Sequence, residues 1–119
     1  MRIRGGIAVE EIKVGDYVRT RSGKIDIFKE KDENYLFARC EKNTYWIPDI
    51  VKHSKNIIDL IEIGDYVNGY RIDNIANGVL VNKAVGIDRS GTFTPIVQYE
   101  NDIKTILTKE QFEQNSYKV

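Results

Sequence analysis

The sequence predicts a mainly β protein built from two related small units. A seven-residue segment at 12–18 (Ile-Lys-Val-Gly-Asp-Tyr-Val) recurs at 61–67 (Ile-Glu-Ile-Gly-Asp-Tyr-Val) and differs only at its second and third positions. A basic-Ile-Asp triplet follows each copy, at 24–26 and again at 71–73. Short runs of β-branched and aromatic residues, separated by turn residues, fill both halves, which is typical of strands.

Length and charge limit the organisation of the chain. The 119 residues leave room for one compact domain or two very small ones that share an interface, because modules of about 50 to 60 residues bury little core alone. We expect residues 1–59 to form the first unit and 60–119 the second, packed as one compact body. The 18 basic and 18 acidic side chains cancel, so no global field recruits nucleic acid or an anionic membrane.

No targeting or membrane segment is apparent in the sequence. No stretch approaches the ~20 apolar residues of a membrane span, and residues 1–8 lack the apolar core of a signal peptide. The single cysteine, Cys40, excludes an intramolecular disulfide and suits a reducing compartment. We expect Cys40 to be a buried small side chain rather than a reactive thiol, and the protein to be cytoplasmic without membrane contact.

The first unit is expected to contain four main strands after a turn at Gly15-Asp16. Large and polar residues alternate there at the strand period of two. The expected strands are 17–21, 24–28, 35–40 and 44–47. Ser22-Gly23 joins the first two as a hairpin. The segment after Pro48 is expected to be an edge strand or a connection, because proline cannot donate to a sheet ladder.

The second unit repeats this plan with variations. Asn68-Gly69 supplies the two positive-φ positions that a type I′ hairpin needs, so a tight turn is expected there. Further strands are expected at 71–75, 79–85 and 93–99, with a longer loop at 86–91. Pro95 marks an edge or a bulge in the last of these strands.

The two halves are expected to end alike. Residues 48–60 and residues 101–113 each show a strand, then a hydroxyl residue, then a helical turn. Thr108 and Gln111 form a Thr-x-x-Gln capping box, which satisfies free amides at a helix start. Ser54 is the residue that would cap the shorter first copy.

This order of elements is the plan of a small SH3-like barrel. Each unit has a Gly-Asp entry, a tight hairpin, two more short strands, a helical turn and a closing strand. Residues 12–20, followed by Ser22-Gly23-Lys24-Ile25, resemble the opening of KOW and Tudor-type barrels. The expected fold class is therefore mainly β, with two tandem small SH3-like barrels that each end in a short helical turn.

The chain also resembles a group of phage and prophage proteins of low-GC Gram-positive bacteria, a group with little established biochemistry. The resemblance rests on residues 12–20, 49–69 and 103–112. It implies a phage accessory protein and points towards small inhibitors of bacterial defence, including anti-CRISPR proteins. The implied partner is a bacterial protein or ribonucleoprotein complex in the cytoplasm of the host cell.

Residues that usually carry catalysis or bind metals are sparse. His53 and Cys40 are the only histidine and cysteine, so a metal cluster is not expected, and no nucleophile motif surrounds Cys40. Asp16 and Asp65 recur with their glycines, but an aspartate in such a turn usually caps local amides. We therefore expect no enzyme, no catalytic residue, no cofactor and no metal.

Protein binding is the leading interpretation. Exposed strand edges are templates for a partner, and interface hot spots are enriched in Tyr, Trp and Arg. We predict Arg19, Arg21, Tyr35 and Trp46 as partner-binding residues, because the second unit lacks this combination. The opposing interpretation is that Tyr35 and Trp46 are core and that the arginines only solvate a strand.

Two other functions remain open in the sequence. The first unit combines basic residues with nearby aromatic residues, the mixture of cations and stacking surface that nucleic-acid binders use; the basic residues are Arg2, Arg4, Arg19, Arg21 and Lys24. The neutral net charge, however, weakens the attraction to phosphates. A KOW/Tudor-like module with weak nucleic-acid binding is thus one alternative, and a phage structural or assembly protein is the other. The leading prediction is stoichiometric inhibition of a bacterial defence nuclease complex, with the oligomeric state left open.

Overall fold

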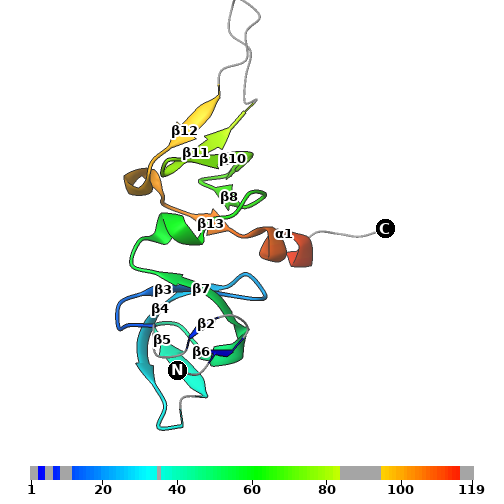
Figure 1. The fold of residues 1–119 in the computed structure, drawn as a ribbon. Helices are drawn as coiled ribbons and strands as arrows, with labels where there is room; N and C mark the ends of the chain where they lie inside the picture. The colour runs from blue at the N-terminus through cyan, green and yellow to red at the C-terminus, as the bar shows by residue number, and fades with distance from the viewer. Residues whose placement is uncertain (1–2, 5–6, 9–11, 35, 84–94, 116–119) are drawn as a thin grey trace, which may run out of the picture. The chain divides into compact units, whose positions relative to one another are not determined.

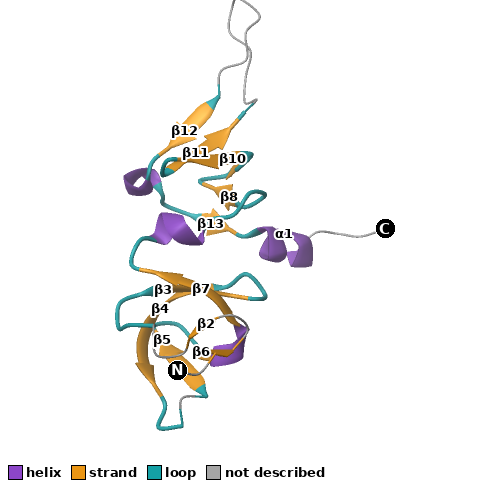
Figure 2. Cartoon of the chain, viewed as in Figure 1, coloured by secondary structure: helices purple, strands orange, loops and turns teal. Residues whose placement is uncertain are grey.

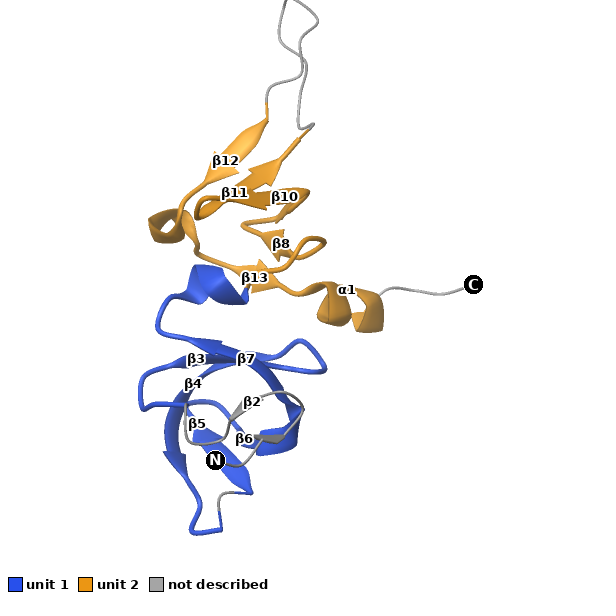
Figure 3. Ribbon diagram, in the orientation of Figure 1, with its two compact units in different colours: residues 1–60 blue, residues 61–119 orange. Residues whose placement is uncertain are grey.

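The computed structural model describes residues 3–4, 7–8, 12–34, 36–83 and 95–115, and it is mainly β (Figures 1 and 2). The chain divides into two compact units, residues 1–60 and 61–119 (Figure 3). Tyr35, the expected loop at 86–91 and the ends of the two strands beside that loop lie outside the described residues. No helix in the described part of the chain is long and apolar enough to cross a membrane.

Unit 1 is organised around one antiparallel sheet. Its described strands are β1 (Ile3–Arg4), β2 (Ile7–Ala8), β3 (Tyr17–Thr20), β4 (Ile25–Lys31), β5 (Phe37–Cys40), β6 (Thr44–Trp46) and β7 (Ile50–Ser54). Strands β3 to β7 form the sheet in the order β6-β5-β4-β3-β7, while β1 and β2 pair with each other. Two 3₁₀ segments follow β6 and β7, namely η2 (Ile47–Asp49) and η3 (Ile57–Leu60).

A tight turn at Gly15-Asp16 leads into this sheet. Gly15 has φ +92°, a conformation that glycine adopts without steric cost, and its N–H donates to Phe28 O at 2.9 Å. The Asp16 carboxylate accepts the backbone N–H of Lys13 at 3.0 Å. The turn thus joins the start of β3 to the neighbouring strand β4.

The core of unit 1 is apolar and lies on one face of the strands. The buried cluster consists of Ile12, Val18, Phe28, Ala38, Ile47 and Ile50. The half-buried Cys40 packs against this cluster. On the other face of the β5–β6 pair, the cross-strand partners Phe37 and Trp46 are 42% and 50% exposed, so this face carries aromatic area to the surface.

Unit 2 is built from two small sheets. Its strands are β8 (Tyr66–Val67), β9 (Tyr70–Arg71), β10 (Asn74–Ala76), β11 (Val79–Asn82), β12 (Ile96–Gln98) and β13 (Ile106–Leu107). The sheet orders are β10-β11-β12 and β13-β8-β9. The segment η4 (Glu100–Asp102) precedes β13, and helix α1 (Lys109–Asn115) follows it. Val67, Ile72 and Leu80 are fully buried.

The predicted local signals in unit 2 are confirmed. Asn68 and Gly69 have φ values of +54° and +84° and join β8 to β9 in a two-residue turn. The capping box forms, because Thr108 N–H donates to Gln111 Oε1 at 3.2 Å and Gln111 N–H donates to Thr108 Oγ1 at 3.3 Å. In unit 1, the Ser54 hydroxyl accepts the N–H of Asn56 at 3.1 Å just before η3.

The two predicted SH3-like barrels are not confirmed, although the mainly β character is. In the described part of unit 1, the edge strands β6 and β7 do not pair with each other, so the sheet stays open. The register shifts between Phe28 and Glu30 in β4 and between Arg19 and Thr20 in β3; such irregularities bend and twist a sheet. In unit 2, the described strands form two separate sheets, and neither closes.

Candidate functional site

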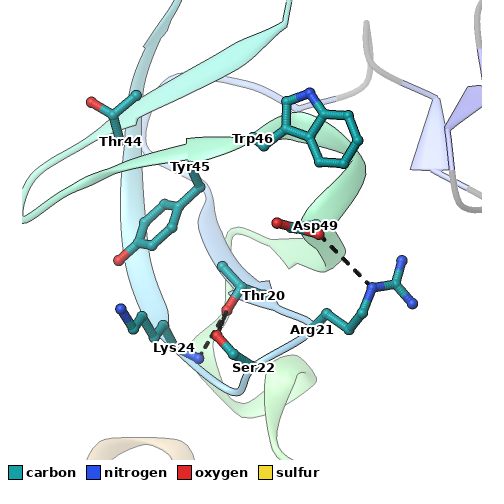
Figure 4. Close-up of a pocket in the computed structure, with 8 residues that line it drawn as sticks. All are labelled: Thr20, Arg21, Ser22, Lys24, Thr44, Tyr45, Trp46 and Asp49. Atoms are coloured by element: carbon teal, nitrogen blue, oxygen red, sulfur yellow. Dashed lines mark hydrogen bonds and ion pairs between the residues drawn. The ribbon is translucent and has the colours of Figure 1, made fainter.

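A cleft of about 420 Å³ opens on unit 1 (Figure 4). Three segments of the chain line it: the end of β3 with its turn into β4, the strand β6, and the segment η2. The lining residues are Thr20, Arg21, Ser22, Lys24, Thr44, Tyr45, Trp46 and Asp49. The cleft therefore collects hydroxyl groups, two cations, one carboxylate and two aromatic rings from distant parts of unit 1.

Backbone hydrogen bonds hold the wall that β3 and its turn provide. Gly23 N–H donates to Thr20 O at 2.9 Å, and Lys24 N–H donates to Thr20 Oγ1 at 3.0 Å. The N–H of Arg21 donates to Asp49 O at 2.7 Å and ties the turn to η2. Backbone hydrogen bonds and the Thr20 hydroxyl therefore fix the positions of Arg21 and Lys24 at the cleft.

The charged groups of the cleft are only loosely paired. Arg21 Nε lies 3.9 Å from Asp49 Oδ1, and the two side chains are 66% and 50% exposed. An exposed pair at this distance contributes little. Arg21 also donates to Pro48 O at 3.3 Å, and Lys24 has no ion pair within the described chain. Two cations face one carboxylate, so the cleft favours a partner group with negative charge.

The two aromatic residues differ in their surroundings. Trp46 is 50% exposed, whereas Tyr45 is half-buried and its hydroxyl donates to Asp26 Oδ2 at 3.0 Å. Burial raises the pKa of Tyr45, and the neighbouring Asp26 carboxylate raises it further. Tyr45 is thus a neutral, oriented phenol, while the indole of Trp46 is free to contact a partner.

Asp26 orders the hairpin that presents these rings. It is buried, and its carboxylate accepts the backbone N–H groups of Ile27 at 2.8 Å and of Lys42 and Asn43 at 3.2 Å. These bonds hold the β5–β6 turn. Asp26 belongs to the repeated basic-Ile-Asp triplet, and that repeat was the sequence signal of its importance.

The four predicted partner-binding residues have different outcomes. Arg21 and Trp46 line the same cleft. Arg19 does not reach it, because its side chain is 1% exposed and Nη1 donates to Leu60 O at 2.9 Å. Arg19 is therefore a structural residue in the interior of unit 1, which corrects its assignment as a surface contact. Tyr35 lies outside the described residues.

Sequence reasoning did not assign Thr20, Ser22, Thr44 or Asp49 to a site. Thr20 and Ser22 are linked by a 3.1 Å contact between their hydroxyl oxygens. Small polar residues of this kind are common in turns and carry no signal of their own. Only the return of β6 and η2 beside the β3–β4 turn brings them into one cleft.

The remaining candidates for chemistry are not at the cleft. Burial, with a smaller contribution from the charge of Asp26, raises the pKa of the Cys40 thiol to about 12, so the thiol is neutral near pH 7. His53 Nδ1 lies 3.1 Å from Asp16 Oδ2. Among the described residues, no group of three or more His, Cys, Asp or Glu side chains is arranged to hold a metal ion.

Comparison with known proteins places the chain in no family. No protein-family model matches the chain, and neither does any curated protein sequence or solved structure.

Proposed function

We propose that the protein works by stoichiometric binding to another protein, through the cleft of unit 1 and without turnover. One observation carries this proposal: Arg21 and Trp46, from different segments, line one cleft with both side chains accessible. Trp, Tyr and Arg dominate interface hot spots because they combine large contact area with directed polar groups. Tyr45 supplies the third such side chain at the same place.

The charge of the cleft supports a protein partner over a nucleic acid. The cations that line the described cleft are Arg21 and Lys24, since Arg19 is buried, and Asp49 lies beside Arg21. Proteins that bind single strands use a positively charged groove that follows several phosphates. Two cations with an adjacent carboxylate supply much less of this electrostatic attraction to phosphates. A KOW/Tudor-like nucleic-acid module is the competing proposal.

The choice of partner rests on the sequence resemblance. Likeness to phage and prophage proteins favours a bacterial defence nuclease complex, protein or ribonucleoprotein, which the protein would inhibit in the host cytoplasm in the manner of an anti-CRISPR protein. A phage structural or assembly role would use the same kind of surface. For the fold, the repeated Gly-Asp turn, hairpin and helical ending support the proposal that each unit is a diverged, open SH3-like barrel.

The test is affinity capture from a host that expresses its defence systems, followed by titration of any nuclease recovered. We expect inhibition that saturates near one protein per complex, because a binder without turnover is consumed by its target. Trp46→Ala should weaken inhibition by about tenfold or more. Tyr99→Ala is the matched control, because Tyr99 is an exposed aromatic residue that belongs to unit 2 and does not line the cleft.

Two outcomes would contradict the proposal. Inhibition at far less than one protein per complex would indicate catalysis. A salt-dependent gel shift of single-stranded DNA or RNA that Trp46→Ala abolishes, with no nuclease recovered, would favour the nucleic-acid module.

A further inference from the structure

Strand β6 is an edge of the five-stranded sheet. Its described hydrogen-bonded neighbour is β5 alone. The register between the two strands is Phe37↔Trp46, Ala38↔Tyr45 and Arg39↔Thr44. No strand in the described part of the chain pairs with the other side of β6, which can accept a further strand.

The hydrogen bonds that flank β6 show which of its backbone groups face β5 and which face the open side. Cys40 N–H donates to Asn43 O at 2.9 Å, and Ile47 N–H donates to Leu36 O at 2.9 Å. These bonds mark hydrogen-bonded pairs just before and just after β6. Because hydrogen-bonded and non-hydrogen-bonded pairs alternate along an antiparallel ladder, Tyr45 turns its backbone groups towards β5.

Thr44 and Trp46 consequently turn their backbone groups away from β5. The carbonyl of Trp46 begins η2, since Trp46 is the N-cap of that segment. This leaves the N–H and C=O of Thr44 and the N–H of Trp46 at the edge. None of these three groups has a hydrogen-bond partner in the described part of the chain.

The cleft runs along this edge. Successive side chains of a strand point to opposite faces, so Tyr45 projects from one face of β6 while Thr44 and Trp46 project from the other. Figure 4 shows the rings of Tyr45 and Trp46 extending to opposite sides of the strand. All three residues nevertheless line one cleft, which requires the cleft to lie beside the edge of β6.

We infer that the cleft receives an extended segment of the partner protein, which adds to β6 as a new edge strand and directs an acidic side chain to Arg21 and Lys24. This inference rests on the proposed function, because it names how that partner is recognised. Backbone pairing at a sheet edge supplies affinity, and side-chain contacts supply specificity. The exposed rings of Trp46 and Phe37 form the apolar part of the contact.

The backbone groups of the edge favour a peptide over a nucleic acid. Two N–H donors and one C=O acceptor match the alternating acceptors and donors of an extended peptide. The phosphates of a nucleic acid offer acceptors only, so a phosphate at this edge would leave the Thr44 carbonyl without a donor. The acidic side chain follows from charge, because Lys24 has no ion pair within the described chain and Arg21 holds Asp49 only at 3.9 Å.

The experiment selects short random linear peptides by display on the full chain and measures binding of those enriched. We expect them to carry an acidic residue among alternating apolar residues. Thr44→Pro removes the outward N–H at an edge position where proline is tolerated, and it should weaken binding by about tenfold or more. Thr44→Val keeps the backbone N–H, so it should weaken binding much less than Thr44→Pro does.

Amide hydrogen exchange gives a second measurement that needs no variant. On peptide binding to the wild-type chain, exchange of the Thr44 and Trp46 amides should slow. The inference is overturned if no peptide is enriched, if the peptides bind Thr44→Pro as tightly as the wild type, or if exchange at both amides is unchanged. It is equally overturned if oligo(dT) slows these amides and no peptide does.

The inference and the proposed function can fail separately. If a captured nuclease is still inhibited by Thr44→Pro at the wild-type ratio, protein binding stands and recognition by the β6 edge is wrong. If selected peptides protect the edge amides but no nuclease is inhibited stoichiometrically, recognition by the edge stands and the proposed inhibition is wrong.

Discussion

The carboxylate of Asp65 accepts the backbone N–H of Lys109 at 2.9 Å, across 44 positions of the chain. The same side chain accepts the N–H of Glu62 at 2.7 Å, so it closes the Gly-Asp turn of unit 2 and holds the first residue of α1. In unit 1, the equivalent Asp16 keeps the turn bond but takes the ring of His53 as its second partner at 3.1 Å. The repeat thus preserves the turn and changes what the turn is attached to.

The first prediction concerns this aspartate. Asp65→Ala should lower the free energy of unfolding by about 2 to 5 kcal/mol, because Asp65 is fully buried and accepts two backbone N–H groups in part-buried hydrogen bonds. Hydrogen bonds to a charged acceptor contribute about 1.5–3 kcal/mol each, and water replaces part of this at the exposed Lys109. Urea unfolding measures the change. Glu33→Ala, at an exposed position, is the control and should stay within about 0.5 kcal/mol. Equal stability of both variants would contradict the role assigned to Asp65.

The second prediction compares the two Asn-Gly turns. Asn68 and Asn77 both have positive φ, +54° and +51°, so glycine suits both backbones. Of the two asparagines, Asn68 alone has side-chain hydrogen bonds to other described residues. Its amide group donates to Gln98 Oε1 at 2.6 Å and Asp102 O at 2.7 Å and accepts from Lys104 N at 2.8 Å and Thr105 N at 3.0 Å. Asn68→Gly should cost about 2 to 4 kcal/mol, and Asn77→Gly only a few tenths. Similar thermal unfolding midpoints for the two variants would refute this.

The third prediction separates Arg19 from Arg21. Arg19→Ala should reduce stability by about 2 kcal/mol or more, because it removes a buried side chain and leaves Leu60 O without its guanidinium donor. Arg21→Ala should change stability by less than about 0.5 kcal/mol, since its side chain is 66% exposed. Binding of the partner or peptide should show the opposite order when each variant is tested well below its melting temperature. Arg21→Ala should weaken binding, and Arg19→Ala should leave it nearly unchanged. A folded Arg21→Ala protein with unimpaired binding would exclude Arg21 from the contact.

The fourth prediction concerns Cys40. With its pKa raised to about 12, the thiol should react with iodoacetamide at pH 8 at least about tenfold more slowly than the same cysteine in urea-unfolded protein, because the thiolate is the nucleophile. Above about pH 9, the unfolded chain releases this proton while the folded chain retains it. Stability should therefore fall as pH rises from about 9 towards 12. Equal alkylation rates in the folded and unfolded protein would show that the thiol is not perturbed.

Local features followed from the sequence because each depends on a few neighbouring residues. The hairpin at Asn68-Gly69 requires only two residues that accept positive φ. The Thr108–Gln111 box requires only the correct spacing at a helix start. The mainly β character followed from strand periodicity summed over many short segments.

The cleft could be predicted only in part. Arg21 and Trp46 were identified by residue type, yet the same reasoning selected Arg19, whose side chain is buried. The strand period places Arg19 on the face opposite Val18, yet both side chains are buried, because Arg19 donates to Leu60 O of η3. These two residues are 41 positions apart, so local sequence does not record the contact.

The duplication, the turns and the strand-rich character can be read from the sequence, since they follow from residue identity and from conformational preferences within a few residues. The open five-stranded sheet in the described part of unit 1 and the edge position of β6 could not be read in this way. Closure and edge exposure depend on bulges, twist and the pairing of strands distant in the chain. The same long-range pairing places Trp46 of β6 and Arg21 of the β3–β4 turn at one cleft.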